Sequence, residues 1–369
     1  MRIKSIVGAT FRLITAVLFI FSGLVKLNDP IGTEIKLEEY FEVFAADFGD
    51  FFLIFIPGAL EIGLFLIILE VVLGIALLMN YRMGITTRVL LGLIIYFTFL
   101  TFYSAYFNKV TDCGCFGDAI PLTPWQSFYK DIFLMVLIFY LFIYRKQFQP
   151  VIGLKMGNIL IGISTFVSLI IGIYAIEHLP YIDFRAYKIG DNIKENMQPE
   201  EQPIFEYTFT RDGEEVKSIK YLLESDGYEL VGYEIINEDK TTPKITDYNV
   251  WNPDVGDFTE QTFQGVKLMV IVVDAEKVEP QNISDISNLL GEVGGSIESV
   301  VLTSTDPSVF ELFRHEYQLA VPYFFSDATV LKAMIRSNPG TILINNGTIA
   351  GKWHYNDTPN VGQLLEALN

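Results

Sequence analysis

Two cysteines, Cys113 and Cys115, are the residues of this 369-residue chain whose type and spacing best suit redox chemistry. They are its only cysteines, and the single residue between them, Gly114, permits a tight bend of the backbone. A disulfide across one residue is strained and more easily reduced, which suits an exchanging pair better than a structural bond. The other interpretation, two small apolar thiols packed under a loop, stays open at this point.

The chemistry of such a pair depends on the charges around it. The thiolate is the nucleophile, so the surroundings have to tune the pKa of one cysteine. Lys109 and Lys130 are nearby cations in the sequence, and Asp112 and Asp118 oppose them. Two cysteines with no histidine close to them in the sequence make a poor metal site, so we expect no bound metal.

Two carboxylates, Glu61 and Glu70, lie inside one apolar stretch within residues 51–78. Nine residues put them about half a helical turn out of phase, so we expect them in different surroundings. We expect Glu61 near the outer end of the stretch, where Lys26 could pair with it, and Glu70 deeper, where it could be protonated. Carboxylates inside a membrane usually face a bundle interior or water, and both a proton-handling role and a packing hydrogen bond remain open.

The elements that would position these residues are apolar segments long enough to cross a bilayer. The chain is 51% hydrophobic, which is too apolar for a wholly soluble protein. The predicted spans are residues 6–25, a segment within 51–78, and residues 89–107, 127–144 and 159–176. The sequence therefore predicts an α-helical bundle whose surroundings are the lipid bilayer.

Basic residues predict the orientation of this bundle. They gather at the N-terminus, at Arg82 and Arg88, and between Arg145 and Lys155, and such groups face the cytoplasm. The cysteine loop and everything after His178 then lie outside. We therefore predict a multi-pass protein of the bacterial inner membrane with a cytoplasmic N-terminus and a periplasmic C-terminal domain, a compartment in which disulfides persist.

The remainder of the chain differs sharply in charge. Residues 1–180 hold 12 basic and 13 acidic side chains, whereas residues 181–369 hold 14 and 31. So acidic a domain does not suggest nucleic-acid binding. Short runs of alternating apolar and polar residues, with a turn at residues 211–213, predict a small β-rich region. Strands alternating with helices follow it, and the chain ends with a hairpin across Asn346 and Gly347 and a last helix. This pattern predicts a mixed sheet covered on both faces.

The first 150 residues resemble the DoxX/MauE family of four-helix membrane proteins. The matching segments are residues 21–30 (FSGLVKLNDP), 36–40, 70–74 and the DCGCFG of residues 112–117. The resemblance implies a four-helix domain over residues 1–150, with residues 151–180 as an added fifth transmembrane helix. It links DoxX members to quinone-coupled respiration, and MauE to methylamine utilisation and the maturation of a disulfide-rich dehydrogenase. It therefore implies a redox role for Cys113 and Cys115, with quinone as the cofactor to consider.

Residues 263–369 resemble a thioredoxin-like α/β domain, which a linker and β-rich region at 181–262 would precede. The turn at residues 337–341 matches the cis-proline turn of that fold, with Pro339 as the candidate cis residue. After the first strand, however, residues 274–280 read DAEKVEP where a CxxC motif should stand. A domain without cysteine cannot itself exchange disulfides.

These features predict an integral membrane thiol–disulfide redox protein, a candidate oxidoreductase that exchanges disulfides at an outward-facing Cys-Gly-Cys. Its partner would be a periplasmic thiol protein or client, and quinone would take or supply the electrons. The alternative is a non-enzymatic membrane scaffold that presents the cysteine-free thioredoxin-like domain to a partner complex. The cysteines favour exchange, and the missing CxxC favours the scaffold.

Overall fold

A computed structural model describes residues 2–110 and 116–369, with the side chains at positions 2–5, 238 and 239 outside this description. The chain divides into two compact units, Met1–Arg185 and Ala186–Asn369. We call them the membrane unit and the C-terminal unit and describe each by itself.

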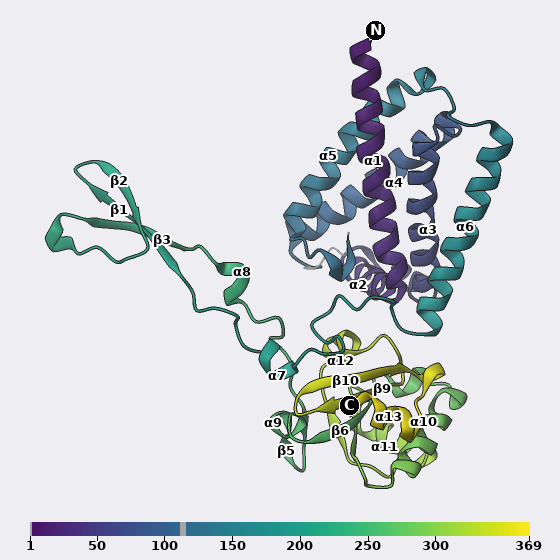
Figure 1. Cartoon of the computed structure of the whole chain (residues 1–369), viewed down its shortest axis with the longest axis vertical. Coiled ribbons are helices and arrows are strands. Elements are labelled where there is room, and N and C mark those ends of the chain that lie inside the picture. The colour runs from purple at the N-terminus through teal and green to yellow at the C-terminus, as the bar shows by residue number, and fades with distance from the viewer. Residues whose placement is uncertain (1, 111–115) are drawn as a thin grey trace. The chain divides into compact units, whose positions relative to one another are not determined.

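The membrane unit is built from long apolar helices (Figure 1). Within the part of the chain that the structure describes, five helical segments are long and apolar enough to cross a membrane: Ile6–Asn28, Asp50–Leu78, Met83–Phe107, Pro124–Ile143 and Leu154–Glu177. The helices themselves are α1 (Arg2–Asn28), α3 (Ala59–Leu78), α4 (Met83–Phe107), α5 (Pro124–Ile143) and α6 (Leu154–Glu177). The five predicted spans are thus confirmed as five helices fit to form a membrane bundle.

Local sequence explains where several of these helices begin. Thr123 caps α5 through a capping box with Gln126, and Pro124 occupies the first helical position, where its missing N–H costs nothing. The second span begins differently, as a 3₁₀ helix, η1 (Asp50–Gly58), that contains Pro57. Proline disturbs the α-helical hydrogen-bond pattern, so regular α-helix starts only at Ala59.

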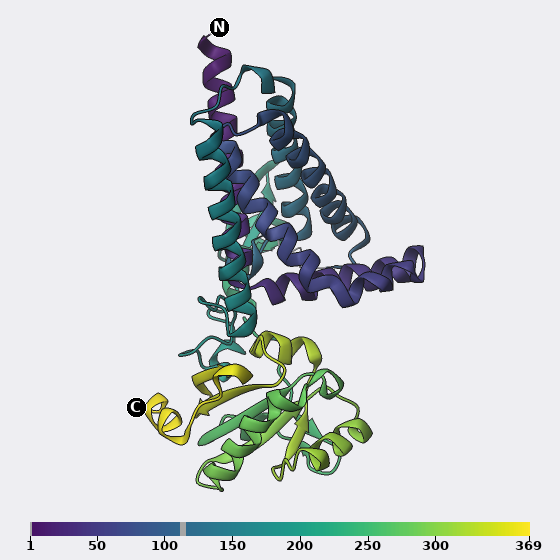
Figure 2. The ribbon, with the colours of Figure 1, turned by 90° about the vertical axis from the view of Figure 1, so that its right-hand side faces the viewer.

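A further helix, α2 (Pro30–Phe48), occupies the acidic stretch between the first two spans. Asp29 caps it by accepting a 3.0 Å hydrogen bond from the Gly32 N–H. Figure 2 shows α2 running across the direction of the long helices. Two of its buried aromatic residues, Tyr40 and Phe44, join a cluster with Leu100 and Tyr103 of α4. The predicted spans leave this stretch out.

The core of the membrane unit lies between α1, α3, α4 and α5. Its fully buried side chains come from all four helices and are aliphatic: Ala16, Leu77, Leu90, Ile138 and Leu141. Large apolar side chains also cover the outside of the unit, among them Phe65, Phe133 and Phe166, each more than half exposed. Such an exterior suits lipid rather than water.

The C-terminal unit is organised around a seven-stranded sheet with the order β10-β9-β6-β7-β8-β4-β5. Its strands are β4 (Trp251–Asn252), β5 (Gly256–Asp257), β6 (Val266–Val272), β7 (Glu298–Thr303), β8 (Tyr323–Phe325), β9 (Gly340–Asn345) and β10 (Thr348–His354). Strands β6, β7 and β8 are parallel, whereas β9, β10 and β4 run antiparallel to their neighbours. The mixed, sheet-rich domain is as predicted.

Helices cover this sheet. They are α10 (Pro280–Val293), α11 (Pro307–Glu316), α12 (Ala328–Met334) and α13 (Val361–Ala367). Ile283 of α10 and Phe310 of α11 pack against Val270 of β6. The preceding residue of β6, Met269, points to the other face and is equally buried, so neither face of the sheet is open to solvent here.

Turn chemistry fixes the connection between β9 and β10. Asn346 and Gly347 have φ angles of 48° and 81°, the left-handed pair that a two-residue hairpin favours. The hairpin predicted from Asn-Gly is therefore confirmed. The peptide bond between Asn338 and Pro339, just before β9, is cis.

A second, separate sheet of three strands follows the order β2-β1-β3. Its strands are β1 (Phe205–Arg211), β2 (Glu214–Ser218) and β3 (Glu229–Ile235), and the turn between the first two is Asp212-Gly213. Lys217 of β2 donates to Glu206 of β1 and to Glu234 of β3. Short elements complete the chain: η2 (Gly117–Ala119), η3 (Arg145–Gln147), α7 (Ile193–Asn196), η4 (Glu224–Asp226), α8 (Glu238–Thr241), α9 (Thr259–Thr262), η5 (Ala275–Lys277) and η6 (Tyr355–Asp357).

Candidate functional site

Cys113 and Cys115 lie outside the described residues, so the site is built from what flanks and surrounds their loop. The described chain stops at Val110, three residues past the end of α4, and resumes at Phe116, just before η2. These two residues show where the loop leaves the bundle and where it returns.

The N-terminal flank of the loop is fixed in an aromatic pocket. Val110 is fully buried in the cluster formed by α2 and α4, and the Ser104 hydroxyl donates to its carbonyl oxygen. Next to it, Lys109 forms an ion pair with Asp47 at the end of α2, and the Tyr103 hydroxyl donates to the same carboxylate. Lys109 and Tyr103 together lower the pKa of Asp47 from its ordinary value. The chain is therefore anchored where it enters the cysteine loop.

The C-terminal flank is anchored on α1 and α5. The ring of Phe116 packs 5.6 Å from that of Phe21, centroid to centroid, and the Lys130 ammonium lies 5.4 Å from the same ring. Gly117 follows in the left-handed region, with φ of 52°, and an added Cβ there would touch Val25 at 3.4 Å. The residue next to Cys115 thus contacts the end of α1 and a lysine of α5.

Close packing of α1 on α3 creates the polar site beneath these anchors. A Cβ added to Gly23 would lie 3.1 Å from the backbone nitrogen of Val71, and one added to Gly74 would lie 2.9 Å from the carbonyl oxygen of Ala16. Only glycine fits such contacts between helix backbones, as in other membrane helix pairs. The two glycines bring the polar side chains that neighbour them in sequence to the same helix interface.

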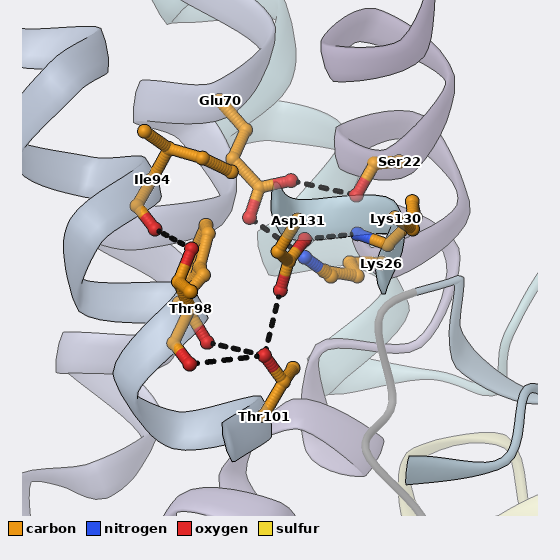
Figure 3. Close-up of polar contacts among 9 residues, drawn as sticks. Ser22, Lys26, Glu70, Ile94, Thr98, Thr101, Lys130 and Asp131 are labelled. Carbon is orange, nitrogen blue, oxygen red and sulfur yellow. Dashed lines mark hydrogen bonds and ion pairs between the residues drawn. The ribbon is translucent and has the colours of Figure 1, made fainter. Parts of the chain in front are cut away.

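Ser22, Lys26 and Glu70 meet at that interface (Figure 3). Lys26 Nζ lies 2.7 Å from Glu70 Oε1, and the Ser22 hydroxyl donates to Glu70 Oε2 over 2.9 Å. The side chains of Lys26 and Glu70 are 12% and 3% exposed. The carboxylate therefore has a partner on each oxygen and forms an ion pair in the interior of the bundle.

This geometry corrects the expected pairing of Lys26 with Glu61. Lys26 lies on Glu70, and Glu61 is exposed at the start of α3. The reason is the half turn that separates the two carboxylates: α3 presents one side to α1, and Glu70 is on that side together with Gly74 and Val71. Glu61 points elsewhere.

A second ion pair, Lys130–Asp131, lies on α5 and is contacted by α4. Asp131 is 1% exposed, its Oδ1 lies 2.5 Å from Lys130 Nζ, and its Oδ2 lies 3.0 Å from the Thr101 hydroxyl (Figure 3). Of these three residues only Lys130 was predicted from the sequence, as a cation near the cysteines; Asp131 and Thr101 were not. An aspartate within an otherwise apolar span was the signal that could have found this pair.

The two pairs are linked through α4. Lys26 Nζ lies 5.1 Å from the centroid of the Phe97 ring, and the Thr101 hydroxyl lies 3.0 Å from the Phe97 carbonyl oxygen as well as from Asp131. Each buried carboxylate is matched by one lysine, and hydroxyl groups complete both contacts. Such an arrangement can hold charge inside the bundle and pass protons through its carboxylates and hydroxyls. It also places the Lys130 ammonium over the ring of Phe116, the first described residue after the cysteines.

Pro339 belongs to the C-terminal unit and takes no part in this cluster. Beside it, the Asn338 side chain donates to the Asp274 carbonyl over 2.8 Å and accepts from the Asp274 N–H, while the Thr305 hydroxyl accepts from the Ala275 N–H. Hydrogen bonds thus tie down the position after β6 where a CxxC was expected. Among the described residues, no group of three or more His, Cys, Asp or Glu side chains could hold a metal ion.

Comparison with known proteins adds two findings. Residues 4–144, which include every membrane residue of the site, match the family of methylamine utilisation protein MauE. Protein TlpB of Flavobacterium psychrophilum is 30% identical over 162 residues, or 41% of this chain. Those residues span 42% of the TlpB chain, less than half of its length. No solved structure matches the chain. The membrane segment that holds the polar cluster and the cysteine loop is therefore similar to MauE.

Proposed function

We propose that the protein is an integral membrane thiol–disulfide exchange protein whose reacting pair is Cys113 and Cys115. One observation carries the proposal: both flanks of the cysteine loop, Val110 and Phe116, pack on the bundle, and the second flank contacts Lys130 of the buried polar cluster. In this scheme the cysteines react beside the Lys130 ammonium, and the buried carboxylates take up and release the protons.

The exchange step moves two electrons and two protons. One cysteine thiolate attacks a partner disulfide, which forms a mixed disulfide and releases one partner thiolate. The second cysteine then attacks its neighbour, which closes the Cys113–Cys115 bond and releases the partner as a dithiol. The reverse sequence oxidises the partner, and the direction depends on the relative reduction potentials.

We assign the surrounding charges supporting roles. Lys130 would favour the thiolate form of the nearby cysteine, since an adjacent cation lowers a thiol pKa. Glu70, with Lys26, would accept and return the protons that accompany electron transfer. Quinone is the electron acceptor that we propose for the direction in which the partner is oxidised: the reduced pair would give quinone two electrons and two protons and yield quinol. In the direction that reduces the partner, quinol would be the donor and would return the pair to the dithiol. Glu61, exposed and on another side of α3, is left without a role in this scheme.

The remaining assignments belong to the same proposal. We place the N-terminus in the bacterial cytoplasm and the C-terminal unit in the periplasm, where a thiol protein would be the partner. We infer a thioredoxin-like fold for residues 263–369 from the parallel β6-β7-β8 core and the antiparallel β9-β10 hairpin beside it. The match of residues 4–144 to MauE supports the membrane half of the scheme.

The scaffold alternative also has one specific observation in its favour. Asn338 and Thr305 hold the backbone after β6 in a closed hydrogen-bond arrangement with no thiol in it. A C-terminal unit of this kind would bind a partner without exchanging disulfides. In that scheme the membrane unit acts as an anchor.

Trapping of a mixed disulfide separates the two functions. Cys115→Ser or Cys113→Ser, expressed singly in the native membrane, should leave one thiol that captures a partner in a complex released by dithiol reagents. Mass spectrometry of the natural protein should find a Cys113–Cys115 disulfide. The variant without either cysteine is the control. If neither single variant captures a thiol partner and the double variant still copurifies with the same proteins, exchange is excluded and the scaffold remains.

A further inference from the structure

A cleft of about 390 Å³ opens in the C-terminal unit at the carboxyl ends of β7 and β8. The chain segments that follow these strands form two of its sides, through Thr305 and Asp306 after β7 and through Ser326 and Asp327 after β8. The segment leading into β4, from Asp247 to Trp251, forms the third. Ligand sites of open α/β sheets lie at this edge, where strands end and loops begin.

The charge of the cleft is uniformly negative. Asp247, Asp306 and Asp327 line it, and none of the ten lining residues, all of them described, is lysine, arginine or histidine. The nearby helix N-termini do not offset this charge. Asp306 accepts from the Ser308 N–H at the start of α11, and Asp327 accepts from the Thr329 N–H at the start of α12. Because each helix end already has its own carboxylate, the cleft does not suit an anion.

An independent feature indicates a ligand. Ser326 lines the cleft, is only 5% exposed, and its hydroxyl oxygen has no hydrogen-bond partner. A buried hydroxyl without a partner costs free energy, and a polar ligand would remove that cost. Trp251 and Phe325 supply an apolar side, with their ring centroids 5.4 Å apart. Trp251 is 45% exposed, so its ring is accessible to a bound molecule.

The chemistry of the ligand follows from this combination. The three carboxylates share one cleft but do not form a group that could hold a metal ion, by the geometry of the described residues. A larger cation with an apolar stem fits better, because its charge can lie among separated carboxylates while its methylenes and charge contact the indole ring. The volume exceeds what a single small ion would need.

We propose that this cleft binds an alkylammonium group, as carried by a lysine side chain of a partner polypeptide or by a free diamine. The carboxylates of Asp247, Asp306 and Asp327 would surround the ammonium, Ser326 would accept a hydrogen bond from it, and Trp251 would cover its stem. The site involves no thiol and does not depend on exchange at Cys113 and Cys115.

Calorimetric titration of the full-length protein in detergent micelles tests the proposal with three probes. These are an N-acetylated, C-amidated Gly-Lys-Gly peptide, the same peptide with norleucine in place of lysine, and 1,5-diaminopentane. Norleucine keeps the stem and lacks the charge, so it should not bind. Binding of the lysine peptide identifies a polypeptide as the source of the group, whereas binding of the diamine alone identifies a free amine.

Charge-removing variants then assign the binding to the cleft. Asp247→Asn, Asp306→Asn and Asp327→Asn combined should weaken binding roughly tenfold, at about twofold for each exposed charge pair. Asparagine caps helices as well as aspartate does, so α11 and α12 should be retained. A matched control removes three carboxylates elsewhere, with Asp212→Asn, Glu214→Gln and Glu215→Gln, and should bind as the natural protein does.

Ser326→Ala is a smaller change that leaves the charge intact. It should weaken binding of the lysine peptide severalfold and should not change the result with the norleucine peptide. The proposal is overturned if neither the lysine peptide nor the diamine binds, if norleucine binds equally well, or if the cleft variant and the surface control lose affinity alike.

Discussion

Charged side chains serve different purposes in the two units. The membrane unit holds 13 basic and 14 acidic residues, and those inside its bundle are matched one to one in buried pairs. The C-terminal unit holds 13 basic and 30 acidic residues, and its ion pairs lie mostly on the surface. Lys26–Glu70 and Lys194–Glu260 both measure 2.7 Å from nitrogen to oxygen, yet the side chains of the second pair are 55% and 66% exposed.

The difference shows that distance alone does not rank ion pairs. At the surface, water and salt screen the attraction, and the net contribution to stability is at most about 1 kcal/mol. In the bundle, a charge that loses its partner has no water to replace it. Disruption of the buried pairs should therefore cost more stability than disruption of surface pairs with the same distance.

The largest expected effect comes from removing one member of the buried pair. Lys26→Met should destabilise the membrane unit by about 3–5 kcal/mol, because Glu70 is left charged and buried without its partner. Lys194→Met removes an equally short surface pair and should cost less than about 1 kcal/mol. Unfolding of the full-length protein in mixed detergent micelles measures both.

A rescue variant checks the cause. Lys26→Met combined with Glu70→Leu replaces the pair by apolar groups and should recover most of the stability, while any proton-handling function is lost. Equal destabilisation by Lys26→Met and Lys194→Met would remove the distinction between the two kinds of pair.

The next effect concerns the helix contact that holds the pair together. Gly74→Ala places a Cβ 2.6 Å from Ile20 Cγ1 and 2.9 Å from the Ala16 carbonyl oxygen, so α1 and α3 have to separate. We expect a loss of about 1–3 kcal/mol, as for other overpacked sites. Gly92→Ala in α4 meets nothing within 4 Å and should be neutral or slightly stabilising. Similar melting of both variants would contradict the close-packing argument.

A smaller effect is expected at the second pair. Thr101→Val removes the hydroxyl 3.0 Å from Asp131 and should cost about 1–2 kcal/mol, since the carboxylate is buried. Thr165→Val is the comparison: its hydroxyl bonds only to the Ile161 carbonyl on an exposed side of α6, and its loss should change stability by less than about 0.5 kcal/mol. The unfolding midpoints of the two variants measure this difference. A larger loss of stability in Thr165→Val than in Thr101→Val would be evidence against the Asp131 contact.

The smallest effect lies in the C-terminal unit and depends on pH. Tyr323 donates a 2.8 Å hydrogen bond to Glu311, and this bond, with Arg314, lowers the pKa of that carboxyl below its ordinary value of 4.5. Its contribution to stability is therefore present above pH 4.5 and is lost as the pH falls through the lowered pKa. Glu311→Gln should melt slightly below the natural protein at pH 7 and alike at low pH. A difference that grows on acidification would have the wrong sign.

Sequence patterns predicted much of the architecture. The five spans were visible as apolar runs, and both tight hairpins followed from turn residues at 212–213 and 346–347. These features are local: a bilayer-length run or an Asn-Gly pair carries its own signal.

The candidate site depended on contacts that no local pattern contains. The partner of Lys26 is 44 positions away, and which carboxylate it meets follows from the side that α3 turns toward α1. Asp131 forms its ion pair with its neighbour in sequence, Lys130, but its hydrogen bond comes from Thr101 on another helix. The acidic cleft draws on three segments between residues 247 and 327, each ordinary by itself. The cysteine pair remains a prediction.

The three-stranded sheet of the C-terminal unit has consequences for solubility. It ends on both sides with an outer strand, β2 and β3, and open strand edges invite pairing with other chains. Both outer strands carry adjacent or repeated glutamates, at positions 214 and 215 and at 229 and 234. Two approaching copies would bring like charges together at the edge. The negative charge of these strands therefore repels other copies of the protein and opposes edge-to-edge association. This repulsion should weaken as salt shortens the screening length to about 8 Å or less.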